Sequence, residues 1–149
     1  MVDSNKIKEL RESTGLSLGQ IKKALDEAVG DEVKALEILK AQGLAVAAKK
    51  SSREVKEGIV SAYIHANKKM GSMIEVLCET DFVARNADFQ QLAHDLAMHV
   101  AATRPEKNED LLAQPFIKDQ ALTVQELINQ YIAKLGENIQ VGRFEILEI

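Results

Sequence analysis

Apolar and polar positions in the first 43 residues repeat at helical spacing, and turn signals divide them into three segments. Apolar residues recur every three or four positions in each segment, as on the buried face of an amphipathic helix. Each segment begins at a capping residue and stops at a glycine. The starts are Asp3 or Ser4, the Ser17–Gln20 capping box and Asp31, and the stops are Gly15, Gly30 and Gly43. The pattern predicts a three-helix bundle over residues 1–43, close to the lower size limit for independent folding.

The composition then changes to alanine, lysine, serine and glutamate. A segment of this kind, partly helical, is typical of a connection between domains. We therefore expect a linker over residues 44–57, followed by a second domain over residues 58–149.

The second domain begins with a predicted β-hairpin. Residues 59–65 are rich in β-branched side chains, residues 67–71 have turn-forming composition, and residues 72–79 place apolar side chains at alternate positions. The hairpin leads directly into Thr80.

The clearest helical stripe of the chain follows this hairpin. Asn86 is a suitable N-cap, and apolar residues recur at helical spacing over Phe89–Ala101. Residues 106–120 are polar and predict a loop anchored by one aromatic side chain, Phe116.

The last part of the chain predicts a helix and a strand. Thr123 and Glu126 form a capping box, Gly136 provides the stop, and residues 138–149 alternate like a strand that changes phase, with a bulge at Gly142. The predicted fold class is α+β: a helical bundle, a linker, and a three-stranded sheet covered by two helices in the order β-β-α-α-β. Such a sheet has a free edge or an uncovered face for pairing with a second copy.

Charge and cysteine content limit the partners. A formal net charge of -4 and a pI near 5.4 argue against direct nucleic-acid binding, because no net field would attract phosphate. Cys78 is the single cysteine, so no internal disulfide can form, and its apolar surroundings predict a small buried thiol. The sequence shows neither a secretory signal nor an apolar run of membrane-spanning length. We expect a cytoplasmic protein with no membrane partner.

Catalytic chemistry is poorly supported. His94 and His99 share a helix but lie about 140° apart around its axis, so they cannot clamp one metal. His65 stands at a strand end, where a half-exposed structural imidazole is expected. The sequence contains no phosphate-binding loop, zinc spacing or nucleophile elbow. We predict no catalytic residues, no metal site, no cofactor and no enzyme activity.

Asp81 and Phe82 stand at the junction of the hairpin and the following helix, and two interpretations are open. Asp81 can cap the next turn while Phe82 packs into the core. Alternatively both side chains point outward, so that Phe82 wedges into a partner and Asp81 competes there for donors or metal-linked groups.

Six stretches of the chain carry a resemblance to a known family. They are Lys8–Gly15, Lys22–Leu25, Gly30–Asp31, Lys34–Ala35, Glu79–Asn86 and Ile132–Ile139. In this order, over nearly the whole chain, they resemble segments of the bacterial elongation factor Ts family. Glu79–Asn86 is similar to its Thr-Asp-Phe-Val signature, and Ile132–Ile139 is similar to its Lys-Ile-Gly-Glu-Asn-Ile stretch.

The resemblance implies a guanine-nucleotide exchange factor that binds elongation factor Tu and promotes GDP release during translation elongation. It implies that Thr80, Asp81, Phe82 and Val83 disturb the magnesium site of that GTPase. The amino-terminal module, similar to ubiquitin-associated domains, would dock on the G domain.

The docking residues implied by the resemblance are Arg11, Leu18 and Gly19. Where the family commonly has Gly-Met-Met-Asp, this chain has Ser17–Gln20, so Leu18 can keep an apolar contact but Gly19 offers no side chain. Longer members have a duplicated core; this chain has one unit, which implies a homodimer. An adapter whose three-helix module binds a peptide or a ubiquitin-like partner is the alternative.

Overall fold

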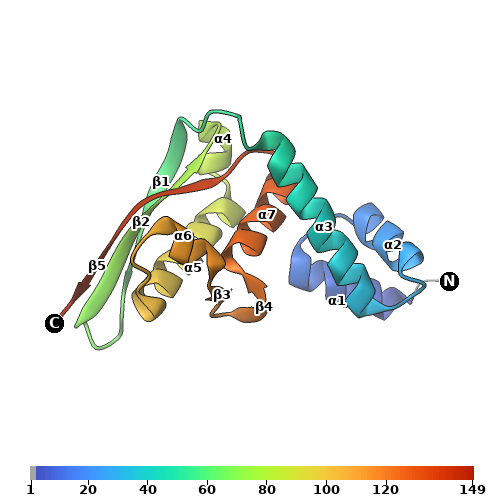
Figure 1. Cartoon of the computed structure of the whole chain (residues 1–149), viewed down its shortest axis with the longest axis horizontal. Helices are drawn as coiled ribbons and strands as arrows, with labels where there is room; N and C mark the ends of the chain where they lie inside the picture. Colours follow the sequence, from blue (N-terminus) through green and yellow to red (C-terminus); the bar gives the residue numbers. More distant parts are fainter. Residues whose placement is uncertain (1–2) are drawn as a thin grey trace.

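The computed structural model describes residues 3–149 and shows a helical N-terminal part beside a sheet covered by helices (Figure 1). In chain order the helices are α1 (Ser4–Thr14), α2 (Leu18–Glu27), α3 (Glu32–Lys50), α4 (Asp81–Ala84), α5 (Ala87–Thr103), α6 (Asn108–Ala113) and α7 (Val124–Leu135). The strands are β1 (Glu57–Ile64), β2 (Met70–Cys78), β3 (Pro115–Phe116), β4 (Asp119–Thr123) and β5 (Gln140–Glu148). The predicted α+β class, with its helical bundle and three-stranded sheet, is confirmed.

The N-terminal helices begin where the sequence predicted. Asp3 caps α1, Ser17 and Gln20 form a reciprocal capping box on α2, and Asp31 caps α3. α2 ends at Glu27, before the predicted stop. The three helices enclose a separate apolar core, which consists of Leu10, Leu16, Ile21, Ala24, Leu25, Ala28, Ala35 and Leu39.

The predicted end of the third helix at Gly43 is wrong, because α3 continues through it to Lys50. Gly43 is buried where α3 meets α7, and a Cβ atom built on it would lie 3.8 Å from Asn129. The missing side chain lets the two helices approach closely, and this packing outweighs the low helix propensity of glycine. The division into residues 1–43, 44–57 and 58–149 stays a prediction.

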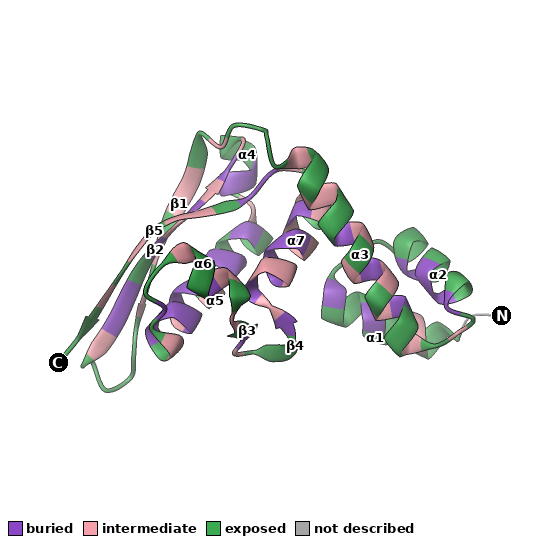
Figure 2. Cartoon of the chain, viewed as in Figure 1, coloured by how far each residue is buried: buried purple, intermediate pink, exposed green. Residues whose placement is uncertain are grey.

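The three long strands form an antiparallel sheet in the order β1-β2-β5. One face of this sheet packs on α5, and Figure 2 shows buried positions on α5 and α7. The largest fully buried side chains of this second core are Ile74, Val76, Phe89, Leu92, Leu96, His99, Val100, Leu111, Val124 and Ile128. We call the opposite side of the sheet the outer face, on which Val60, Ile64, Met73 and Leu147 are exposed.

The predicted bulge at Gly142 is confirmed. The pairing register of β2 with β5 shifts between Ile74 and Val76, so Gly142 and Arg143 both lie opposite Glu75. The Glu75 carboxylate accepts hydrogen bonds from the Arg143 amide at 2.7 Å and from its Nε at 2.9 Å. These bonds hold the pKa of Glu75 down, at about 2. A carboxylate therefore stabilises the irregular strand.

The prediction of a loop over residues 106–120 is wrong, because this segment contains α6 and the small β3-β4 hairpin. Leu111 on α6 and Phe116 on β3 are both buried, so the predicted anchor at Phe116 is confirmed. The segment is polar in sequence, and only its packing on the core makes two short elements stable.

Candidate functional site

The junction between β2 and α5 is held by two helix caps. Thr80 caps α4, and its hydroxyl accepts a hydrogen bond from the Val83 amide at 3.3 Å. Asn86 caps α5, and its side chain accepts from the amides of Asp88 and Phe89. Caps at both ends give this short segment a defined backbone path.

The side chains of α4 point in two directions. Val83 and Ala84 are buried in the core beneath the sheet, whereas Phe82 is 84% exposed. The interpretation in which Asp81 caps the turn and Phe82 packs into the core is therefore wrong. The buried Val83 anchors α4, so its side chain is not available to a partner. We call Asp81 and Phe82 together the tip.

Asp81 is the charged half of the tip. Its side chain is about half exposed and pairs with Arg85 one turn later, at 2.7 Å. An exposed pair of this type contributes little stability, roughly 0.3–0.5 kcal/mol, and can exchange one partner for another. The tip therefore presents an aromatic ring next to a carboxylate that is free to accept other donors.

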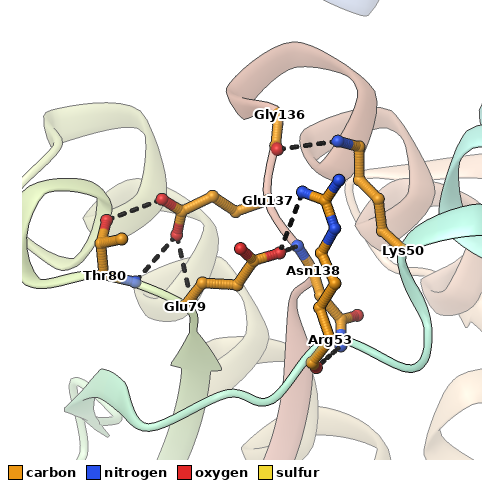
Figure 3. Close-up of polar contacts among 7 residues, drawn as sticks. All are labelled: Lys50, Arg53, Glu79, Thr80, Gly136, Glu137 and Asn138. Carbon is orange, nitrogen blue, oxygen red and sulfur yellow. Dashed lines mark hydrogen bonds and ion pairs between the residues drawn. The ribbon is translucent and has the colours of Figure 1, made fainter.

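The base of the tip is held by the carboxylate of Glu137, which comes from the turn after α7 (Figure 3). One oxygen accepts from the amides of Glu79 and Thr80, both at 3.0 Å, and the other accepts from the Thr80 hydroxyl at 2.6 Å. We call these three bonds the Glu137 clasp. Glu137 was not among the predicted site residues, although it lies in one of the stretches that resemble the family.

A second set of contacts surrounds the clasp and includes the segment after α3 (Figure 3). The Glu79 carboxylate accepts from the Asn138 amide at 2.8 Å and pairs with Arg53 at 3.6 Å. The Asn138 side chain donates to the Arg53 carbonyl at 2.8 Å. Three parts of the chain that are distant in sequence therefore meet beneath the tip.

Cys78 lies under the same junction and is fully buried. Its thiol donates to the Thr80 carbonyl at 3.2 Å, and burial raises the pKa of the thiol to about 11. The predicted buried, inert thiol is confirmed by this position.

The candidate docking residues lie on α1 and α2, apart from the tip (Figure 1). Arg11 and the 44% exposed Leu18 line one shallow hollow, together with Lys8 and Lys22. Gly19 does not line this hollow, and a Cβ atom built on it would meet no other atom within 4 Å. The structure therefore brings Arg11 and Leu18 together on an open surface.

The histidines have structural surroundings. His99 is buried, with Nε2 2.9 Å from the Gln114 side chain and Nδ1 accepting the Ile117 amide at 3.2 Å. The exposed His65 is hydrogen bonded to the Tyr63 hydroxyl at 3.0 Å. Residues 3–149 contain no group of three or more potential ligands placed to hold a metal ion. Over the same residues, no helix combines the length and apolar character that crossing a membrane requires.

Comparison with known proteins places these features in a family context. The family model described as "Elongation factor TS" matches residues 79–149, beginning at Glu79 in the clasp. Elongation factor Ts from Moorella thermoacetica is 43% identical, in an alignment that covers all of this chain and 96% of the relative. Elongation factor Ts from Fervidobacterium nodosum is 40% identical and covers 99% of this chain and 98% of the relative.

These alignments also show a difference in length. The alignment with the Moorella protein extends over 194 residues, whereas this chain has 149. The relative therefore contains internal residues with no counterpart here. Elongation factor Ts from a Synechococcus species is longer still, because the 96% of this chain that matches covers only 67% of it, at 41% identity.

Proposed function

This chain belongs to the elongation factor Ts family, and we propose that it is a guanine-nucleotide exchange factor that binds elongation factor Tu and promotes release of GDP. The exposure of Phe82 beside Asp81, on a junction held at both ends, is the observation that carries this proposal. Such a factor makes and breaks no covalent bond, so it is not an enzyme in the usual sense. It would act in the cytoplasm, during translation elongation.

In the proposed mechanism the tip enters the nucleotide site of the GTPase. Phe82 would displace groups around the bound magnesium, and the Asp81 carboxylate would compete for donors there. The magnesium ion offsets phosphate charge, so its displacement weakens the hold on GDP. Thr80 and Val83 would support the tip from behind, by capping and by burial.

Reciprocal coupling sets a limit on this mechanism. A factor that lowers the affinity of the GTPase for nucleotide must itself be bound less tightly once nucleotide returns. It accelerates the approach to equilibrium and does not select GTP over GDP. We therefore expect the nucleotide that rebinds to be set by cellular concentrations.

We also propose that residues 1–43 dock on the G domain through the hollow at Arg11 and Leu18. A half-exposed leucine beside a guanidinium suits a mixed apolar and acidic partner surface. Gly19 would contribute only its backbone there.

A homodimer through the outer face is the third part of the proposal. Val60, Ile64, Met73 and Leu147 are all exposed on this face, and a hollow of about 360 Å³ lies among the last three. The ion pair of Glu75 with Arg143 adds a polar border. An apolar centre with a polar rim is the usual composition of a protein interface.

Release of labelled GDP from elongation factor Tu tests the exchange function. The parent chain is expected to raise the release rate, and Phe82→Ala to lose most of this effect because the wedge is gone. Leu44→Ala is the matched control, since Leu44 is also exposed but lies on α3. A parent chain that leaves GDP release unchanged would contradict the proposal and favour the adapter alternative. A Phe82→Ala variant as active as the parent would contradict the proposed role of Phe82 as a wedge.

A further inference from the structure

The tip stands on an element that cannot hold its own shape. α4 contains four residues, and a helical turn of this length is unstable in isolation in water because nucleation costs more than its few hydrogen bonds return. Its geometry must therefore be imposed from outside. Val83 and Ala84 anchor the inner side of α4, and the capping Thr80, which precedes its first residue, supports its amino-terminal end.

Glu137 is the group that holds Thr80. Its carboxylate accepts three hydrogen bonds at once, from the amides of Glu79 and Thr80 and from the Thr80 hydroxyl. Because the hydroxyl donates to Glu137, its lone pair is directed to the Val83 amide, which completes the cap. Bonds of this type, with one ionised partner, are shorter and about twice as strong as neutral ones.

The carboxylate is itself held in place by its surroundings. Asn138, the next residue, donates its amide to Glu79 and its side chain to the Arg53 carbonyl. Lys50 donates to the carbonyl of Gly136, the preceding residue, at 3.0 Å. The residues on both sides of Glu137 are thus fixed, so the clasp is a rigid support.

We infer that Glu137 is a positioning residue for exchange: it acts through Thr80 to hold Asp81 and Phe82 in the orientation that enters the GTPase. The inference rests on the proposed function. Glu137 contacts the base of the tip. It is not one of the two tip residues, Asp81 and Phe82, that would contact the GTPase. A loosened tip would have to be ordered when it enters the nucleotide site, after docking, and that entropic cost would slow nucleotide release.

Kinetics of GDP release from elongation factor Tu provide the first test. Glu137→Ala is expected to lower the maximal release rate about tenfold, since it removes three bonds to a charged group. The chain concentration that gives half of the maximal rate should stay within about twofold of the parent value, because docking at α1 and α2 is unchanged. Glu137→Gln keeps an acceptor for the two amides and should recover most of the rate.

The second readout needs no GTPase. The chain has no tryptophan, so Phe82→Trp introduces a single fluorescent reporter at the tip. Its anisotropy should fall when Glu137→Ala is added, and amide hydrogen exchange at Glu79 and Thr80 should become faster. Glu126→Ala is the matched control, because Glu126 also accepts a backbone amide, that of Thr123, but at the start of α7.

The outcomes separate the two proposals. A parent chain without exchange activity would contradict the proposed function. The anisotropy and the amide hydrogen exchange would still show whether Glu137 orders the tip. Parent-like anisotropy and parent-like release in Glu137→Ala would overturn the positioning role. Equal loss of amide protection across α5 would also overturn it, since Glu137 would then serve general stability.

Discussion

Phe82 shows at the scale of one residue how a fold can hold an apolar side chain in water. Full burial of a phenylalanine is worth about 1.5–3 kcal/mol, which the protein forgoes at this position. Its neighbours Val83 and Ala84 are buried instead, so the inward positions of this single turn are already occupied. The exposed ring is a consequence of the direction of α4, which the cap at Thr80 fixes.

Cys78 provides a residue-scale prediction about chemical reactivity. The thiol is fully buried and its pKa is raised to about 11, so very little thiolate exists near neutral pH. Alkylation by iodoacetamide at about pH 8 should be at least roughly a hundredfold slower in the folded chain than in urea. Mass spectrometry over time measures both rates. Similar rates in the two states would show that the thiol reaches solvent.

Elements whose signals are local could be predicted from the sequence. The caps at Asp31, Asn86 and Thr123 act within three residues of themselves, and each helix begins where they indicate. The predicted helix end at Gly43 was wrong because the helical conformation there depends on packing against α7, far along the chain. The Glu137 clasp could not be predicted from spacing, since its partners lie 57 and 58 positions away.

The contact of α5 with the segment before β4 is an element-scale case of the same kind. His99 on α5 meets Gln114 and Ile117, and Thr103 donates to the same Gln114 side chain oxygen. Because Nδ1 accepts the Ile117 amide, the proton of the neutral ring is on Nε2. These bonds fasten the segment that was predicted as a loop.

His99 gives this contact a dependence on pH. Burial lowers the pKa of His99 below its usual 6.5, so the unfolded chain binds the proton more readily than the folded chain. The contribution of His99 to the free energy of unfolding should therefore be constant above about pH 7 and fall as pH decreases below about 6.5. Urea unfolding at a series of pH values measures this slope.

The control for this pH dependence is another histidine of the same helix. His99→Gln should lower stability at neutral pH and remove much of the slope between about pH 7 and pH 5. His94→Gln should leave the slope in place, because His94 is exposed. A slope that survives in His99→Gln would assign the effect to other groups.

At the scale of the whole molecule, α7 connects the two surfaces that we propose for partner binding. Ala133 packs against the N-terminal core, and Lys134 pairs with Asp88 of α5 at 3.0 Å. The same helix ends at Leu135, and its C-cap Gly136 leads into Glu137 beneath the tip. Because α3 also packs along α7, the proposed docking surface and the tip are connected through the same packed helices. We therefore expect docking at α1 and α2 to set where the tip meets the GTPase.

The outer face carries the prediction about assembly. Met73 lies on the central strand β2 and is 54% exposed, so a charged side chain there should cost the isolated chain little stability. In a dimer formed through this face the same charge would be buried with no opposite charge to pair with. Analytical ultracentrifugation at micromolar concentration should give the parent twice the 16.4 kDa chain mass and give Met73→Glu the mass of one chain. Leu44→Glu, an equal change at an exposed site on α3, should remain dimeric. A monomeric parent, or a Met73→Glu variant that still pairs, would exclude this face as the interface.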